Sequence, residues 1–177
     1  MEEKDILEAI SEDKEYGFKM LVEKYQNLVL NLAYSLSRDF YLAQDIAQEV
    51  FIKIFKKINS FRKEAKLSTW IYRIALNMSY KFLKRRKTIP LEKASPLSLS
   101  TTLSEPPLKN KKELIREAIN RLPIKYRTVI VLKDLENFSY KDIAKLLRCR
   151  IGTVESRLFR ARKLLKKFLE PLIKEGL

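Results

Sequence analysis

One stretch of the chain, residues 88–110, interrupts a helical pattern that runs through nearly all of the remaining sequence. It holds four of the six prolines together with a cluster of Ser and Thr. Proline removes a backbone donor and blocks helix continuation, so this stretch predicts a flexible linker; its length disfavours the alternative, an ordered surface loop. The expected fold is therefore all-α, with two small helical domains at residues 1–87 and 111–177.

Apolar residues recur at helical spacing in both domains. In the first domain this spacing predicts three helices, at about residues 16–36, 42–58 and 68–86. In the second domain it predicts four helices, at about residues 112–121, 125–133, 140–147 and 152–169. Two serines stand at helix starts and are expected to act as N-caps, Ser68 in the first domain and Ser139 in the second.

The net charge of +15 is concentrated after residue 60. Residues 1–60 carry 8 Lys/Arg and 11 Asp/Glu, residues 61–112 carry 13 and 3, and residues 113–177 carry 16 and 8. The middle and C-terminal parts therefore suit a polyanion such as nucleic acid, whereas the first part can face another kind of partner.

Composition disfavours several classes of protein. The single cysteine, Cys149, excludes an internal disulfide, and the absence of histidine argues against a zinc site or a His-based catalytic triad, so no cofactor is expected. An enzyme such as a nuclease is disfavoured because acidic residues are sparse where the charge is most positive. The acidic N-terminus and the absence of a long apolar run predict a cytoplasmic protein without membrane insertion.

Residues 42–58 present two different faces when they are placed on a helix. One face is an apolar core stripe. The opposite face carries four candidate docking residues, Asp45, Gln48, Glu49 and Ile52. An isoleucine among acidic and amide groups fits either a solvated face with one stray apolar residue or a docking surface with an apolar centre and an acidic rim.

The following predicted helix combines aromatic, amide and basic side chains outside its core stripe. Its candidate residues are Trp70, Arg73, Asn77, Tyr80, Lys84 and Arg85. Basic groups attract phosphate, aromatic rings stack on unpaired bases, and an Asn side chain can read a base edge. The alternative is a basic solvated face with half-buried aromatics, but the interleaving of aromatic and basic residues favours single-stranded nucleic acid.

Residues 138–165 predict a helix-turn-helix, because a capped helix is followed by a short break and a second, more basic helix. The candidate DNA-contacting residues are Arg150, Thr153, Glu155, Ser156, Arg157, Phe159, Arg160 and Lys163. Their hydroxyl, carboxylate and cationic groups can meet base edges or phosphates in a major groove, although Arg157 lies nearer the apolar side. The charge pattern favours DNA binding over an ordinary helical hairpin.

Three segments together resemble the sigma factors of bacterial RNA polymerase, and their order and spacing match the short, two-domain extracytoplasmic-function branch. The polymerase-binding helix of that family resembles residues 43–62, AQDIAQEVFIKIFKKINSFR, which contain its Asp-x-x-Gln-Glu-x-Phe pattern. The segment that melts and reads the −10 promoter element resembles residues 68–87, STWIYRIALNMSYKFLKRRK. The domain that reads the −35 element resembles residues 122–165.

The resemblance implies promoter recognition without catalysis by this chain. It places the four candidate docking residues on a coiled coil of the large catalytic subunit of core RNA polymerase. It places Asn77 against a flipped base of the −10 element, with the loop from Phe61 to Leu67 forming part of the base pocket. Ser156, Phe159 and Arg160 would read the −35 duplex of promoter DNA. An anti-sigma protein becomes a candidate partner.

Two departures from the family pattern limit what can be transferred about promoter sequence. Arg148 and Arg150 stand in the turn before the reading helix, where the family usually has Gly and often Pro. Leu76 and Lys81 stand near Asn77, where the family often has a basic and an acidic residue. The remaining alternative is a free-standing helix-turn-helix regulator that binds an operator without polymerase, as a dimer on a two-fold site.

Overall fold

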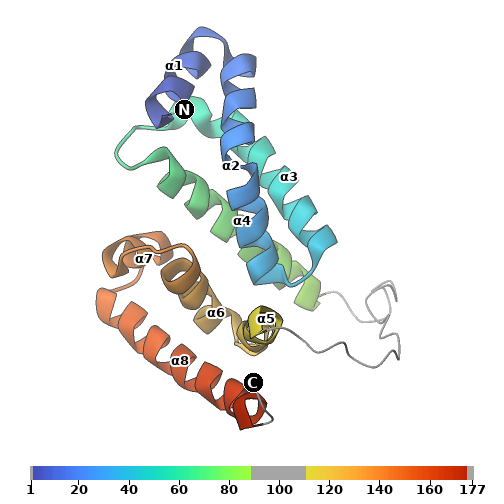
Figure 1. Ribbon diagram of the computed structural model, residues 1–177. Helices are drawn as coiled ribbons and strands as arrows, with labels where there is room; N and C mark the ends of the chain where they lie inside the picture. Colours follow the sequence, from blue (N-terminus) through green and yellow to red (C-terminus); the bar gives the residue numbers. More distant parts are fainter. Residues whose placement is uncertain (1, 89–110, 175–177) are drawn as a thin grey trace. The chain divides into compact units, whose positions relative to one another are not determined.

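The computed structural model describes residues 2–88 and 111–174, and every regular element within these ranges is a helix (Figure 1). The chain divides into two compact units, Met1–Arg85 and Arg86–Leu177. The all-α, two-part fold expected from the sequence is confirmed. The predicted linker lies outside the described residues, apart from Thr88, which is the last residue of helix α4.

The first unit is built from α1 (Glu3–Glu12), α2 (Lys14–Ser37), α3 (Phe40–Lys57), a short 3₁₀ turn (Ile58–Ser60) and α4 (Leu67–Thr88). Helix α1 was not predicted, whereas the other three helices lie close to their expected ranges. Apolar stripes from all four helices are buried, with Ile6, Leu21, Ile46 and Ile71 fully inaccessible. The spacing of these residues is what makes each helix amphipathic and gives the unit a common core.

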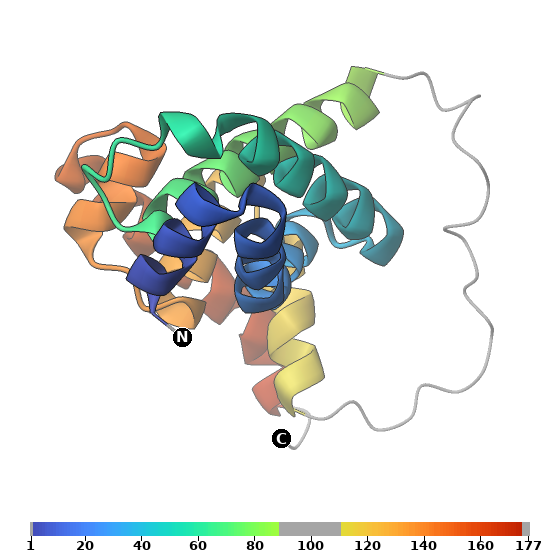
Figure 2. The same cartoon turned by 90° about the horizontal axis from the view of Figure 1, so that it is seen from above.

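A carboxylate from a distant part of the chain caps α4. The Glu3 side chain accepts hydrogen bonds from the backbone N–H groups of Leu67 (2.8 Å) and Ser68 (3.0 Å), and from the Tyr25 hydroxyl (3.0 Å). Helix α1 and the start of α4 therefore lie side by side, as both views show (Figures 1 and 2). Ser68 is not the N-cap that the sequence predicted; it is the second residue of the helix, and Glu3 supplies the acceptor in its place.

The same hydrogen bonds set the ionisation of Glu3 and Tyr25. Burial alone would raise the pKa of Glu3, but hydrogen bonds from Ser68, Leu67 and Tyr25 outweigh it and lower the pKa. Burial raises the pKa of Tyr25, and the neighbouring Glu3 charge raises it further. Glu3 is therefore held as a carboxylate, the form that a helix N-terminus stabilises.

Helices α1 and α2 meet closely at a glycine. Gly17 is buried, and a Cβ atom at this position would overlap the backbone N and Cα of Ile10 and the carbonyl carbon of Ala9. Only a residue without a side chain allows α2 to approach the backbone of α1 this closely.

The second unit contains α5 (Lys111–Arg121), α6 (Ile124–Ile130), a π-helical turn (Val131–Leu135), α7 (Tyr140–Leu147) and α8 (Ile151–Lys174). The sequence predicted one uninterrupted helix at about 125–133; instead the backbone widens into the π turn after Ile130. Apolar spacing did not distinguish an α-helical from a π-helical turn here, because the pattern showed only that Val131 and Leu132 face the core, where both are buried. The predicted Ser139 cap is confirmed, since its Oγ accepts from the Asp142 N–H (3.1 Å).

A buried arginine joins α5 to α6. Arg127 is 5% exposed, and its Nη2 donates to the carbonyl oxygens of Asn120 (2.9 Å) and Leu122 (2.8 Å) at the C-terminal end of α5. Carbonyls at a helix C-terminus lack partners inside the helix, and a cation there also complements the helix dipole. Arg127 therefore stabilises the connection between the end of α5 and the start of α6.

Gly17→Ala should lower the free energy of unfolding by about 1–3 kcal/mol, because the added methyl group must displace the backbone of α1. Gly152→Ala is the matched control, since Gly152 is exposed in α8 and no atom lies within 4 Å of an added Cβ. Alanine at position 152 should stabilise the protein by up to about 1 kcal/mol. Urea unfolding followed by far-UV circular dichroism measures both; equal effects of the two variants would contradict the close contact at Gly17.

Glu3→Gln should destabilise the first unit at neutral pH and have progressively less effect in acid. The folded-state pKa of Glu3 is lowered, so its stabilisation is complete above the unfolded-state pKa of about 4.3 and is lost as pH falls through the folded-state pKa. The deficit at neutral pH should be about 1 kcal/mol, as for other lost helix caps. Urea unfolding at several pH values tests this, with Glu12→Gln, an exposed carboxylate on the same helix, as control. A deficit that does not vary with pH would contradict the role of the charge.

Candidate partner and nucleic-acid interfaces

The outer face of α3 carries the four candidate docking residues together. Asp45, Gln48 and Glu49 are exposed and Ile52 is 42% exposed, whereas Ile46 on the core face of the same helix is fully buried. The structure thus brings carboxylate, amide and apolar groups onto one accessible surface, with the division of faces that the helical spacing predicted.

An apolar groove between α2 and α3 extends this surface beyond the predicted residues. Its volume is 380 Å³, and it is lined by Phe18, Val22, Gln48, Phe51, Ile52, Phe55 and Lys56. The Phe18 ring makes edge contacts with Phe55 (centroids 4.9 Å apart) and Phe51 (6.5 Å). Ile52 is therefore part of an apolar groove rather than a stray residue on a solvated face. The sequence did not reveal Phe18 and Val22 as groove residues, because their spacing on α2 is that of core positions.

Two aromatic rings pack against each other where α4 begins. The centroids of Phe61 and Trp70 lie 5.3 Å apart with an angle of 47° between the ring planes, and both side chains are half-buried. Arg73, one turn further along, is half-buried too, and its Nε is buried with no hydrogen-bond partner among the described residues. Among the described residues the same holds for the Nε of Arg127, whose Nη2 has a structural role in the second unit, so this feature alone does not distinguish a binding site.

The remaining predicted residues of α4 continue along the helix. Asn77, Lys84 and Arg85 are exposed and Tyr80 is half-buried, while Ile71 and Ala75 on the core stripe are fully buried. The structure therefore presents amide, aromatic and basic groups in the succession that the sequence predicted.

Helices α7 and α8 form the predicted helix-turn-helix, and an arginine holds the turn between them in a left-handed conformation. Arg148 ends α7 with φ 50° and ψ 49°. The backbone N–H groups of Arg148 and Cys149 both donate to the Ala144 carbonyl, which closes the helix in the usual way. The left-handed conformation favours glycine, because for a residue with a Cβ atom it costs about 1–2 kcal/mol in conformational energy.

The candidate DNA-contacting residues lie at the start and along the first half of α8. Arg150, Glu155, Ser156, Phe159, Arg160 and Lys163 are exposed, and Thr153 and Arg157 are half-buried. Phe159 is 72% exposed, whereas Val154 and Leu158 are buried on the opposite side. Just before this helix, Lys141, Lys145, Arg148 and Arg150 line a shallow depression of 580 Å³, so the turn itself is strongly basic.

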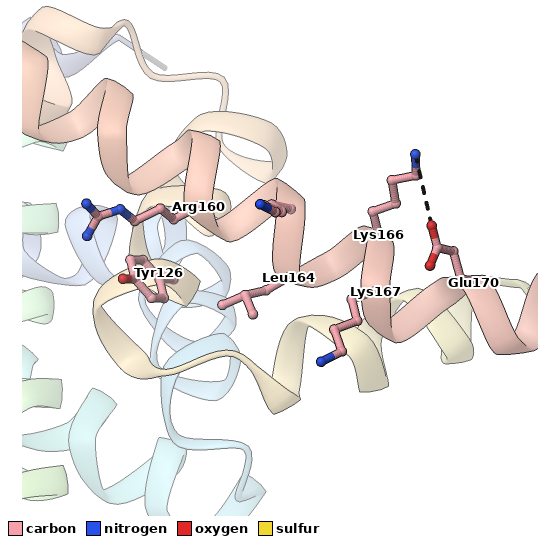
Figure 3. A pocket seen from close by; sticks show the side chains of 7 residues that line it. Tyr126, Arg160, Leu164, Lys166, Lys167 and Glu170 are labelled. Carbon is pink, nitrogen blue, oxygen red and sulfur yellow. Dashed lines mark ion pairs between the residues drawn. The ribbon is translucent and has the colours of Figure 1, made fainter.

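A basic groove that the sequence did not predict runs between α6 and α8 (Figure 3). Its volume is 620 Å³, and it is lined by Tyr126, Arg160, Lys163, Leu164, Lys166, Lys167 and Glu170. Arg160 lines this groove beside Tyr126, and its proximity lowers the pKa of the Tyr126 hydroxyl. The helical spacing of Lys163, Lys166 and Lys167 is the sequence signal that could have indicated the groove.

Within residues 2–88 and 111–174, no group of three or more His, Cys, Asp or Glu side chains is arranged to hold a metal ion. None of the helices described there is both long and apolar enough to cross a membrane.

Known proteins match both units of the chain. The model of sigma-70 region 2 matches residues 21–89, and the model of sigma-70 region 4 matches residues 112–165. The RNA polymerase sigma-H factor of Pseudomonas aeruginosa is 33% identical, over 99% of this chain and 97% of that protein. The ECF RNA polymerase sigma-E factor of Haemophilus influenzae is 34% identical, over 95% of each. Among solved structures, the sigma factor RpoE of Bartonella quintana, in complex with the anti-sigma factor NepR, has a TM-score of 0.70 at 27% identity, covering 86% of this chain and 96% of that chain.

Arg148→Gly should stabilise the second unit and weaken its attraction to DNA. Glycine adopts the left-handed conformation without the Cβ penalty, so the free energy of unfolding should rise by about 0.5–1 kcal/mol. Loss of one exposed charge beside the reading helix should lower the affinity for arbitrary duplex DNA several-fold.

Arg148→Ala is the control for this prediction, because it removes the same charge but keeps a Cβ atom. It should weaken DNA binding without stabilising the protein. Thermal unfolding and fluorescence anisotropy with labelled duplex measure the two effects. Equal stability of the glycine and alanine variants would contradict strain at Arg148.

Proposed function

Because this chain belongs to the extracytoplasmic-function branch of the sigma-70 family of RNA polymerase sigma factors, we propose that it binds core RNA polymerase and directs initiation at promoters by recognising −35 and −10 elements. In this mechanism the chain catalyses no reaction; it positions the polymerase, and the polymerase makes RNA. The observation that carries the proposal is the succession of three exposed surfaces along the chain: the outer face of α3, the start of α4 and the outer face of α8.

The surface on α3 supports docking on core polymerase. Asp45 and Glu49 provide exposed carboxylates on the helix whose Ile52 borders the apolar groove. A helical partner that offers basic side chains together with an apolar one would match both features. The family resemblance assigns a coiled coil of the large catalytic subunit to this position.

The start of α4 supports capture of an unpaired base from a melted −10 element. Extrusion of a base costs a few kcal/mol, and stacking on an aromatic side chain returns about 1–3 kcal/mol per base. The Phe61–Trp70 pair offers such a stacking surface, and Asn77 offers an amide that can read a base edge. Lys84 and Arg85, further along the helix, suit the phosphates of the adjacent strand.

The outer face of α8 supports reading of a −35 duplex in the major groove. Arg160 can donate to guanine, Glu155 can accept from a cytosine amino group, and the exposed ring of Phe159 can contact a thymine methyl group. The basic turn at Arg148 and Arg150 suits the flanking phosphates, so binding to free DNA should be strongly electrostatic.

An anti-sigma protein is a further proposed partner of this chain. The structurally similar RpoE of Bartonella quintana is in complex with the anti-sigma factor NepR. An inhibitor that covered the α3 surface or the outer face of α8 would block polymerase or promoter access.

The proposal predicts that this protein and core RNA polymerase together produce defined transcripts from a library of promoter fragments, and that neither does so alone. Asp45→Lys combined with Glu49→Lys should reduce these transcripts by more than about tenfold, because like charges replace complementary ones at a close-packed interface. Glu8→Lys combined with Glu12→Lys is the matched control, since it makes the same charge change on exposed positions of α1.

Loss of transcription by the α3 variant, with retention by the α1 variant, would support both the function and the docking face. Tight, sequence-specific DNA binding by the protein alone, without any polymerase-dependent transcript, would overturn the proposal in favour of an operator-binding regulator.

A further inference from the structure

We infer that Glu3 is a positioning residue for base capture: its carboxylate fixes the first turn of α4 and thereby the Phe61–Trp70 pair. This inference rests on the function proposed above, in which that aromatic pair receives an unpaired base. It assigns a role to the N-terminal helix, which none of the predicted site residues occupies.

The Glu3 carboxylate connects three helices at one point. From the first turn of α1 it accepts the Leu67 N–H at Oε2 (2.8 Å) and the Ser68 N–H at Oε1 (3.0 Å), the first two amides of α4. The same Oε1 accepts the Tyr25 hydroxyl of α2 (3.0 Å), which further restrains the carboxylate. Amides in the first turn of a helix have no acceptor inside the helix, so this external acceptor stabilises the ordered turn.

Trp70 belongs to the turn that Glu3 caps. Its backbone N–H donates to the Lys66 carbonyl (3.1 Å), directly before α4, and its ring contacts Phe61 across the intervening loop. That loop contains Lys63 in a left-handed conformation, with φ 57°, and has no regular helix between Ser60 and Leu67. The position of the Phe61 ring relative to Trp70 therefore depends on where the first turn of α4 is held.

Order in this turn matters for binding, because a pre-organised aromatic surface loses less conformational freedom when a base stacks on it. A frayed first turn would have to be ordered by the base itself. Removal of the cap should therefore weaken binding of single-stranded −10 DNA while leaving the α3 surface and the second unit unchanged.

Trp70 is the only tryptophan in the sequence, so its fluorescence in the full chain reports directly on this turn. Glu3→Ala should shift the emission to longer wavelength and lower its anisotropy, because the indole gains water contact and freedom. Glu3→Gln keeps a carbonyl acceptor and should give an intermediate change, and Tyr25→Phe a small one. Glu12→Gln removes an exposed carboxylate from the same helix and should leave the emission unchanged. Far-UV circular dichroism verifies that each variant remains folded.

The functional test uses holoenzyme and a promoter recovered from the fragment library. Glu3→Ala should lower the affinity for the single-stranded −10 non-template strand about tenfold, the scale of one lost stacking contact. Binding to the −35 duplex and to core polymerase should stay within about twofold of the unaltered protein, a difference of about 0.4 kcal/mol.

Three outcomes are informative. A shifted Trp70 emission together with weaker −10 binding and unchanged −35 and polymerase binding supports the positioning role. Unchanged −10 binding, or an equal loss in Glu12→Gln, overturns it and leaves the proposed function standing. Failure of the unaltered holoenzyme to bind the −10 strand at all would overturn the proposed function itself, and with it the inference.

Discussion

In both small units, hydrogen bonds to the backbone groups at helix ends connect one helix to the next. Four N–H groups at one end of each helix and four carbonyls at the other need partners from outside the helix. Asp13, Asp39 and Ser139 meet this need locally, each by accepting from amides a few residues ahead. Glu3 and Arg127 meet it at a distance, and these two contacts tie separate helices together.

The helices bury one stripe each, which leaves their outer faces available for partners. On α3 and α8 the outer face carries the charged and polar residues that the sequence singled out, while fully buried residues such as Ile46 and Val154 hold the opposite side. On α4 the division is less sharp, because Trp70, Arg73 and Tyr80 are only half-buried. Half-burial suits a surface that must hold its own shape and still accept a flat base.

Helical spacing predicted the helical fold and the exposure of the α3 and α8 residues, because these depend only on neighbours along one helix, and the proline-rich stretch at residues 88–110 predicted the two-part division. Helical spacing could not predict the cap on α4, because the acceptor is the carboxylate of Glu3 on another helix, and Ser68 lies inside α4 as its second residue. Helical spacing could not predict the groove beside Ile52 either, because the groove forms only where Phe18 and Val22 of α2 lie against α3. Tyr126 likewise meets Arg160 only once α6 and α8 are packed.

The left-handed turn at Arg148 has two energetic effects that respond differently to salt. The steric cost of a Cβ atom at positive φ does not depend on ionic strength. The attraction of the arginine for DNA phosphate does, because dissolved salt screens exposed charges over about 8 Å at physiological concentration and over shorter distances above it. The gain in DNA affinity from the arginine is therefore largest in dilute electrolyte and shrinks in concentrated electrolyte, while its steric cost to folding stays the same. Glycine in this turn would therefore gain on arginine as the salt concentration rises.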